Sequence, residues 1–188
     1  EARLALLESL AIPVLVVAGD ALGPLGPRDL SRLSANLSAA AARARDSGVK
    51  LALEFDSRAS FPDNLQSAVA LVEDVGQPSL GICLDWFHFT VGPSKPLDLG
   101  LLTRDTLAHV QLSDIADVPR EMATDADRIL PGEGCSPPGD LLGVLATLGS
   151  SAAVCIEVMN PRLWRVPPRQ FGEIAMTSLR RLLGQASM

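Results

Sequence analysis

Hydrophobic positions along the chain follow two periods that alternate. Short runs of aliphatic and β-branched residues predict strands at 13–19, 50–56, 80–88, 107–114 and 152–159. Longer segments have apolar residues at steps of three and four, and they predict helices at 1–10, 28–46, 62–76, 138–148 and 168–183. In the third of these helices Pro62 is expected in the first turn, and Gly76 marks the end. A long polar loop follows the fourth strand.

Five strand–helix units in series predict an α/β fold whose strands form a parallel sheet with right-handed crossovers. One face of the strands carries mostly small residues, and the other carries large aliphatic ones such as Leu53, Leu84 and Val110. This division is typical of a barrel, because helices cover the outer face of a barrel. No glycine-rich phosphate-binding motif follows any strand, which disfavours a doubly wound nucleotide-binding sheet.

The composition limits the classes of protein that fit. The chain has 188 residues, 47% of them hydrophobic, and a formal net charge of −6, which describes one globular domain over 1–188. The acidic balance disfavours nucleic acid as a partner, and no apolar run reaches the roughly 18 residues of a membrane span. Three cysteines without paired spacing favour free thiols and a cytoplasmic protein. Because Glu1 opens the chain inside a predicted helix, we expect a piece of a longer protein.

Four of the predicted strands carry one oxygen-bearing side chain each near the carboxyl end, all in one phase of the strand alternation. These side chains are Glu54, Asp85, Gln111 and Glu157. The carboxyl ends of barrel strands meet at one rim, so the four can converge there. Three carboxylates and one amide oxygen suit Mg²⁺ or Mn²⁺, and Zn²⁺ less well, while a cation would relieve their repulsion. A single strand-end acid is most often solvated, but four in register favour one divalent metal.

The sequence around these positions resembles a known family. The motifs are Leu53-Glu54, Leu84-Asp85-Trp-Phe-His88, His109-Val-Gln111-Leu-Ser-Asp114, Arg128-Ile-Leu-Pro-Gly-Glu-Gly134 and Ile156-Glu157-Val. Together they are similar to the xylose isomerase-like TIM barrels, the sugar phosphate isomerase/epimerase superfamily, over essentially the whole chain. The resemblance implies a TIM (β/α)₈-type barrel of which only the C-terminal five βα units, strands four to eight, are present. On the order of 80 residues, carrying strands one to three, would then be absent.

The resemblance also implies roles for single residues. The residues that match the metal ligands on the last four strands of the family are Glu54, Asp85, Gln111 and Glu157. Many members have His where this chain has Gln111, and Gln at this place is similar to hydroxypyruvate isomerases and bacterial 3-dehydroshikimate dehydratases. His88 would contact a substrate oxygen, and Arg128 would hold a substrate hydroxyl or carboxylate.

Several further residues allow more than one interpretation. Trp164, in the loop after the last strand, is a candidate wall for the substrate. If the strand at 80–88 is regular, His88 is one residue out of phase with the ligands and supports them from behind. His109 is interpreted as a hydrogen-bonded residue of the interior rather than a ligand. Asp114 either orients a ligand or begins the polar loop.

A pair of glutamates on opposite sides of the rim indicates proton transfer next to a carbonyl group. Glu157 is expected to remove the proton and Glu54 to return it, with the metal stabilising the enediolate between the two steps. The prediction is therefore a metal-dependent isomerase or epimerase of a small sugar, sugar phosphate, or hydroxy or keto acid. A homo-oligomer is compatible with this prediction.

Two alternatives stay open at this stage. The first is a lyase similar to 3-dehydroshikimate dehydratase, for which Arg128, Arg162 and Arg165 could hold a substrate carboxylate. The second is an inactive truncated barrel that serves as a binding module, which a metal-free protein would favour. An endonuclease fits poorly, because that chemistry uses more metal ligands and a basic surface.

Overall fold

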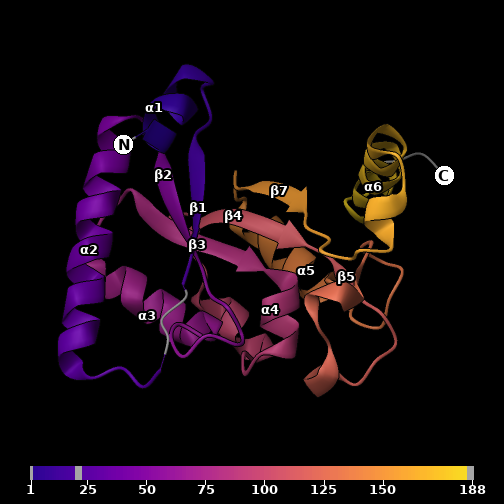
Figure 1. Cartoon of the computed structure of the whole chain (residues 1–188), viewed down its shortest axis with the longest axis horizontal. Coiled ribbons are helices and arrows are strands. Elements are labelled where there is room, and N and C mark those ends of the chain that lie inside the picture. Colours follow the sequence, from indigo (N-terminus) through magenta and orange to yellow (C-terminus); the bar gives the residue numbers. More distant parts are fainter. Residues whose placement is uncertain (1, 20–22, 186–188) are drawn as a thin grey trace.

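Five parallel strands form one curled sheet in the computed structural model, which describes residues 2–19 and 23–185 (Figure 1). The strand order is β1-β2-β3-β4-β7. The bounds are β1 Val14–Ala18, β2 Lys50–Glu54, β3 Leu80–Asp85, β4 Leu107–Leu112 and β7 Ala153–Ile156. Every neighbouring pair is parallel. The predicted α/β fold and the five predicted strands are therefore confirmed.

Helices precede and follow the strands. They are α1 Ala2–Ser9, α2 Pro27–Asp46, α3 Leu65–Val75, α4 Trp86–Val91, α5 Gly139–Leu148 and α6 Pro168–Leu182. Short 3₁₀ turns lie in the connections: η1 Pro96–Leu101, η2 Arg120–Met122, η3 Asp125–Asp127 and η4 Leu163–Arg165. Helix α2 lies at one end of the long axis of the molecule and α6 lies at the other (Figure 1). No helix of the described part is long and apolar enough to cross a membrane.

The main hydrophobic core lies between one face of the sheet and its helices. Large side chains of the central strands, among them Leu53, Leu84 and Val110, are buried in one cluster with residues of α2 and α3. Burying each such side chain contributes about 1.5–3 kcal/mol. The opposite face has a separate cluster that includes the small residues Ala52 and Cys83. The predicted division of the strands into two faces is thus confirmed, and the small residues leave room for polar side chains above them.

The predicted strand at 80–88 is too long. Strand β3 ends at Asp85, whose carboxylate accepts hydrogen bonds from the backbone N–H groups of Phe87 (2.7 Å) and His88 (3.4 Å). This cap satisfies donors that the first turn of a helix leaves free, so helix α4 begins directly after the strand. His88 therefore lies on a helical turn and not on a strand.

The helix predicted at 62–76 begins at Leu65 instead of Pro62. Asn64 caps it, because its Oδ1 accepts a hydrogen bond from the backbone N–H of Ser67 at 2.8 Å. Pro62 lies in the preceding loop, where its carbonyl oxygen accepts from the backbone N–H of Asp56. A proline fits the first turn of a helix but does not by itself satisfy the free donors there, whereas Asn64 does.

A short antiparallel ribbon lies in the segment predicted as a polar loop. Strand β5 (Asp114–Ile115) pairs with β6 (Arg128–Ile129), and Ile115 is the direct partner of Arg128. The chain between them contains η2 and η3. The ribbon therefore returns Arg128 to the carboxyl end of the sheet after a long excursion.

Candidate metal centre

Acidic side chains from three strands meet at the carboxyl edge of the sheet. Glu54 ends β2, Asp85 ends β3, and Glu157 directly follows β7. One ligand atom each from Glu54, Asp85 and His88 lies within 4.8 Å of the other two. The backbone N–H of Glu157 donates to the carbonyl oxygen of Leu112, which continues the parallel pairing to this position. The three carboxylates predicted to converge therefore share one rim, and His88 joins them from α4.

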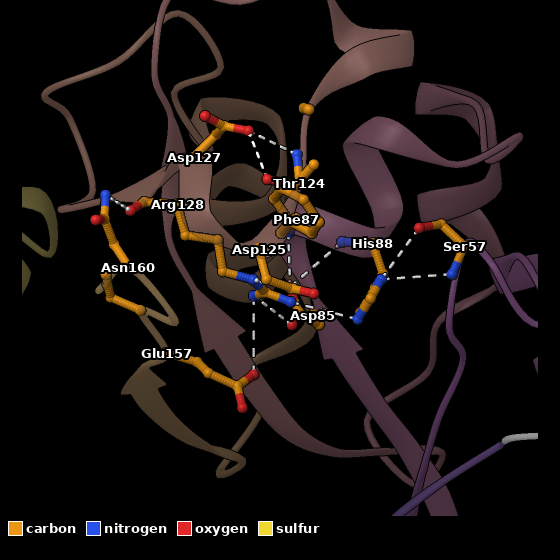
Figure 2. Close-up of polar contacts among 12 residues, drawn as sticks. Ser57, Asp85, Phe87, His88, Thr124, Asp125, Asp127, Arg128, Glu157 and Asn160 are labelled. Carbon is orange, nitrogen blue, oxygen red and sulfur yellow. Dashed lines mark hydrogen bonds and ion pairs between the residues drawn. The ribbon is translucent and has the colours of Figure 1, made fainter. Parts of the chain in front are cut away.

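Arg128 lies in the middle of this acid cluster (Figure 2). Its Nη1 is 2.6 Å from Asp85 Oδ2 and 3.8 Å from Glu157 Oε2. Its Nε donates to Asp125 Oδ1 at 2.9 Å. The guanidinium carbon lies 4.2 Å from the centre of the Phe87 ring, a cation–π contact. With only 2% of its side chain exposed, Arg128 is the internal counter-ion of the cluster.

His88 directs one ring nitrogen at the cluster and the other at the β2–α3 loop. Its Nε2 lies 3.3 Å from Arg128 Nη2 and 3.9 Å from Glu54 Oε1. Its Nδ1 lies 3.1 Å from Ser57 Oγ and 3.5 Å from Asp56 Oδ1. Two groups that can only donate face the ring, the Arg128 guanidinium at Nε2 and the backbone N–H of Ser57 at Nδ1 (3.4 Å), and neutral His88 can accept from one of them. The regular strand assumed for His88 ends at Asp85, and the turn into α4 brings the ring into the cluster; whether His88 binds the metal or supports its ligands stays a prediction.

The acids carry more negative charge than Arg128 neutralises. Burial raises the pKa of Glu54 to about 8, and the charges of Asp85 and Glu157 add to the rise. Burial also raises the pKa of Glu157 to about 7, with the charge of Asp85 as the next cause. Burial alone would lower the pKa of Arg128, but its contacts with Asp85 raise it, so the guanidinium stays charged. Three carboxylates around one guanidinium must either hold protons or receive a second cation.

The chemistry of the donors fits a divalent cation. Glu157 Oε2 is buried and accepts no hydrogen bond from any residue that the structure describes, an arrangement that is costly unless something else neutralises the oxygen. Carboxylate oxygens suit Mg²⁺ and Mn²⁺, and an imidazole nitrogen adds a donor that Mn²⁺ and Zn²⁺ accept. The donor set therefore suggests a divalent metal without selecting one.

The fourth predicted ligand, Gln111, lies on the same rim but turns its oxygen away. It is the register partner of Asp85 on β4, and its Oε1 accepts a hydrogen bond from the Cys83 thiol at 3.0 Å. Burial raises the pKa of Cys83, so the thiol keeps the proton that it donates. A role of Gln111 as a metal ligand remains a prediction.

His109 lies one layer below this rim, as its interpretation as an interior residue requires. Its Nε2 is 3.3 Å from the sulfur of Cys155. Burial lowers the pKa of His109 and raises that of Cys155 to about 11. The pair is therefore neutral near pH 7 and belongs to the packing of the inner face.

Two residues that hold Arg128 in place have no local sequence signal strong enough to identify them. Asp125 binds the guanidinium and precedes Arg128 by one 3₁₀ turn. Asn160 is buried, and its Nδ2 donates to the backbone carbonyl of Arg128 at 3.1 Å. Asn160 lies three residues after Glu157, so one connection fixes both an acid and its counter-ion.

Asp114 anchors the loop that follows the ribbon, which decides between its two interpretations. It is fully buried, and its carboxylate accepts hydrogen bonds from the backbone N–H groups of Ile115 (2.8 Å), Gly132 (3.1 Å) and Ser136 (2.8 Å). All of its described partners are backbone groups of the ribbon and the loop. Asp114 therefore fixes the segment that carries Arg128.

Trp164 lies in η4, beyond the last strand. Its Nε1 donates to the carbonyl oxygen of Val158 at 3.0 Å, and the residue is 58% exposed. It is thus held close to the chain that follows Glu157, while its role as a substrate wall remains a prediction. Arg162 and Arg165, considered as carboxylate holders, are exposed.

Several known proteins are similar to this chain. The sequence profile described as "Xylose isomerase-like TIM barrel" matches residues 1–182. An inosose isomerase from Halalkalibacterium halodurans is 33% identical over 124 residues, which make up 65% of this chain and 44% of that protein. An inosose isomerase from Bacillus subtilis (strain 168) is 30% identical over 120 residues, or 63% of this chain and 43% of that protein. The match spans less than half the length of these curated relatives.

Solved structures share the fold. The IOLI protein with a bound zinc atom superposes with a TM-score of 0.88 at 22% identity, covering 100% of this chain and 69% of that chain. A D-psicose 3-epimerase studied in the presence of D-fructose has a TM-score of 0.75 at 21% identity, covering 96% and 68%. These likenesses support a TIM-barrel-like α/β fold, of which this chain contributes five strands.

Proposed function

The chain belongs to the xylose isomerase-like TIM barrel family, and we propose that it carries the catalytic centre of a divalent-metal-dependent sugar isomerase or epimerase. One observation carries the proposal: Glu54, Asp85 and His88 converge within 4.8 Å, and Glu157 faces them across Arg128. Relatives named inosose isomerase and a fold neighbour named D-psicose 3-epimerase support a ketose or keto-inositol as the substrate class.

Within this family fold we assign the five strands to the last five of the eight. The strands that carry the four predicted ligands, β2, β3, β4 and β7, are consecutive neighbours in the sheet, with β7 at its edge, and the chain covers 69% of the IOLI structure. Three further strands and their helices would then lie between the outer edges of β1 and β7 and close the barrel.

For the metal we assign one divalent cation, Mn²⁺ or Mg²⁺. The proposed ligands are Glu54, Asp85, Gln111 and Glu157, with the Nε2 atom of His88 as a further donor within reach. The Gln111 amide must turn so that its oxygen leaves the Cys83 thiol. When bound, the cation supplies the Lewis acidity that polarises a substrate carbonyl and a neighbouring hydroxyl.

The side chains of the chain itself would move the proton. Glu54 and Glu157 come from strands separated by β3 and β4, so they can approach a small substrate from two sides. We assign Glu157 as the base that removes a proton from the carbon next to the carbonyl, and Glu54 as the acid that returns it. In the metal-free chain burial raises the pKa of Glu157 to about 7 and that of Glu54 to about 8, so each can hold a proton near neutral pH; a cation bound to the same carboxylates would lower both pKa values. Arg128 would donate to a substrate oxygen.

Exchange of substrate hydrogen with solvent tests this proposal at its first chemical step. The full chain, loaded with Mn²⁺ in D₂O, is incubated with a keto-inositol or with D-psicose, and the sugar is analysed by mass spectrometry. We expect one deuterium at the carbon next to the carbonyl. Replacing the base in Glu157→Gln should slow this exchange by about 10²- to 10⁴-fold, whereas Glu133→Gln, which alters an exposed loop acid, should not.

Two outcomes would contradict the proposal. The absence of exchange in a chain that demonstrably binds metal would leave a binding module in place of an isomerase. Formation of an aromatic product from 3-dehydroshikimate, without exchange on ketoses, would instead establish the lyase. The exposure of Arg162 and Arg165 weighs against the lyase, because the buried cluster then offers one arginine, Arg128, for a substrate carboxylate.

A further inference from the structure

We infer that Arg128 is a resident cation that competes with the divalent metal for Asp85, so that metal binding releases its guanidinium toward the substrate. The inference rests on the proposed metal centre and adds an order of events to it. In the described structure Arg128 alone places positive charge between Asp85 and Glu157, with its Nη1 2.6 Å from one and 3.8 Å from the other.

Arg128 and a metal would both approach Asp85 from the same side. Asp85 Oδ1 accepts the backbone N–H groups of Phe87 and His88, so Oδ2 is the oxygen that could hold a metal, and Arg128 Nη1 lies 2.6 Å from it. The guanidinium and the metal would both be positively charged, and at such a short distance in a buried site they would repel each other strongly. Arg128 Nη2 also lies 3.3 Å from His88 Nε2, the ring nitrogen that faces Glu54. A metal that took these atoms would therefore displace Arg128 from Asp85 and His88.

The anchoring of Arg128 allows the guanidinium to move while its backbone stays in place. The backbone is fixed by pairing with Ile115 and by the hydrogen bond from Asn160. The other end of the guanidinium already contacts Asp125, whose side chain is 47% exposed. The ion pair between Asp125 and Arg128 can remain after the contact with Asp85 is broken. The Nη1 atom then stays at the rim, where it could donate to a substrate hydroxyl or carboxylate.

A simpler role for Arg128 is that of a structural ion pair. In that case its removal lowers the stability of the protein and does nothing for metal affinity. In the competition model, removal lowers the stability of the metal-free protein but strengthens metal binding. The sign of the change in metal affinity therefore separates the two roles.

The test is calorimetric titration of Mn²⁺ into the EDTA-treated full chain, for the wild type, Arg128→Met and a matched control. Arg104→Met removes one exposed arginine at the opposite, amino-terminal end of the strands. We expect Kd for Mn²⁺ to fall about tenfold in Arg128→Met and to stay unchanged in Arg104→Met. The thermal midpoint of metal-free Arg128→Met should lie below that of the wild type, and Mn²⁺ should raise it by more.

The outcomes distinguish this inference from the proposed function. If the wild type binds Mn²⁺ and Arg128→Met binds it equally or more weakly, the competition is overturned and the metal centre stands. If neither binds Mn²⁺, the metal centre itself is overturned. Should Arg128→Met fail to fold even with Mn²⁺, Arg128→Gln decides: it removes the positive charge but keeps N–H donors for the acids, so tighter binding is again expected and unchanged binding contradicts the inference.

Discussion

Asp85 uses its two carboxylate oxygens for two tasks. Oδ1 accepts the backbone N–H groups that begin α4, and Oδ2 binds Arg128. The first contact positions the helix that carries His88, and the second balances the charge of the cluster. The position of Asp85 at the end of a predicted strand indicates an acid at the rim. Its contacts with α4 and with Arg128 depend in addition on the path of the chain after β3.

Removing the charge of Asp85 tests this double role. Asp85→Asn should lower the free energy of unfolding of the metal-free protein by up to about 3–5 kcal/mol, because it removes the nearest carboxylate from the buried Arg128 and leaves it with Asp125 and the more distant Glu157. Asparagine keeps an oxygen that can cap α4, so the loss reports on the ion pair. Urea denaturation in EDTA measures it, and the exposed Asp117→Asn should change the value by less than about 0.5 kcal/mol. Equal effects of the two substitutions would contradict the role assigned to Asp85.

The raised pKa values predict how stability depends on pH. Glu54 has a pKa of about 8 in the folded chain against 4.5 as its ordinary value. Between these values the folded state holds a proton that the unfolded state has lost, so the free energy of unfolding must fall as pH rises. We therefore expect metal-free protein to lose stability from about pH 5 to pH 8. Metal affinity should rise over the upper part of the same range, because bound metal displaces the protons.

Urea denaturation in EDTA at several pH values checks this expectation. Glu54→Gln carries no charge at any pH, so its stability curve should be flatter and should cross above that of the wild type at high pH. Glu133→Gln, at an exposed acid, should follow the wild-type curve. A wild-type protein that gains stability toward pH 8 without metal would show that Glu54 is not a buried, proton-holding acid.

Among the elements, the β5–β6 ribbon and its loop place Arg128 beside the acids, although Arg128 does not lie on a strand of the main sheet. The ribbon pairs Arg128 with Ile115, and Asp114 holds the loop after it through Gly132 and Ser136. Gly134 lies against this anchor: a Cβ there would be 2.6 Å from Asp114 Oδ1 and would collide with the carbonyl oxygen of Ile115. The close approach explains why this position requires glycine.

Adding one methyl group at Gly134 should therefore displace the ribbon. We expect Gly134→Ala to lower the free energy of unfolding by about 1–3 kcal/mol, the usual cost of overpacking, and to weaken Mn²⁺ binding. Gly143→Ala is the matched control, because nothing lies within 4 Å of a Cβ there. In the middle of α5 it should stabilise the chain by about 0.5–1 kcal/mol. Denaturation curves and metal titrations of both variants give the answer, and equal stabilities would contradict the close contact.

At the scale of the whole molecule, the sheet has two edges. Strands β1 and β7 each have one neighbour in the five-stranded sheet, while β2, β3 and β4 have two. Every residue of β3 is buried, but the residues of β1 and β7 are half-buried or exposed. Unpaired edges are ready to accept another strand, from the same chain or from another copy.

Amide hydrogen exchange should follow this order. We expect peptides covering β3 and β4 to exchange far more slowly than those covering β1 and β7, because the central strands open only when most of the structure does. Mass spectrometry at several protein concentrations measures the difference. Uniform protection that grows with concentration would show instead that the edges pair between copies, and would establish a homo-oligomer.

The pattern of residues along the chain is enough to predict the order of elements and the convergence of the acids. The two hydrophobic periods distinguish strands from helices, and side chains two residues apart on a strand share a face. In a parallel sheet with strands in register, a polar residue near each carboxyl end must therefore reach the same rim. Glu54, Asp85 and Glu157 follow from this rule, and the family motifs that contain them carry the resemblance.

The surroundings of those acids depend on contacts between distant parts of the chain, which the residue pattern does not predict. Arg128 and Asp85 are 43 residues apart in sequence, and no local period encodes a contact of that kind. The turn of His88 into the cluster depends on the Asp85 cap, and the direction of the Gln111 amide depends on the Cys83 thiol. Hydrogen bonds and charges in the buried site set these side-chain orientations. A buried polar group is stable only when it is paired, and its partner must be one of the groups that the fold places nearby.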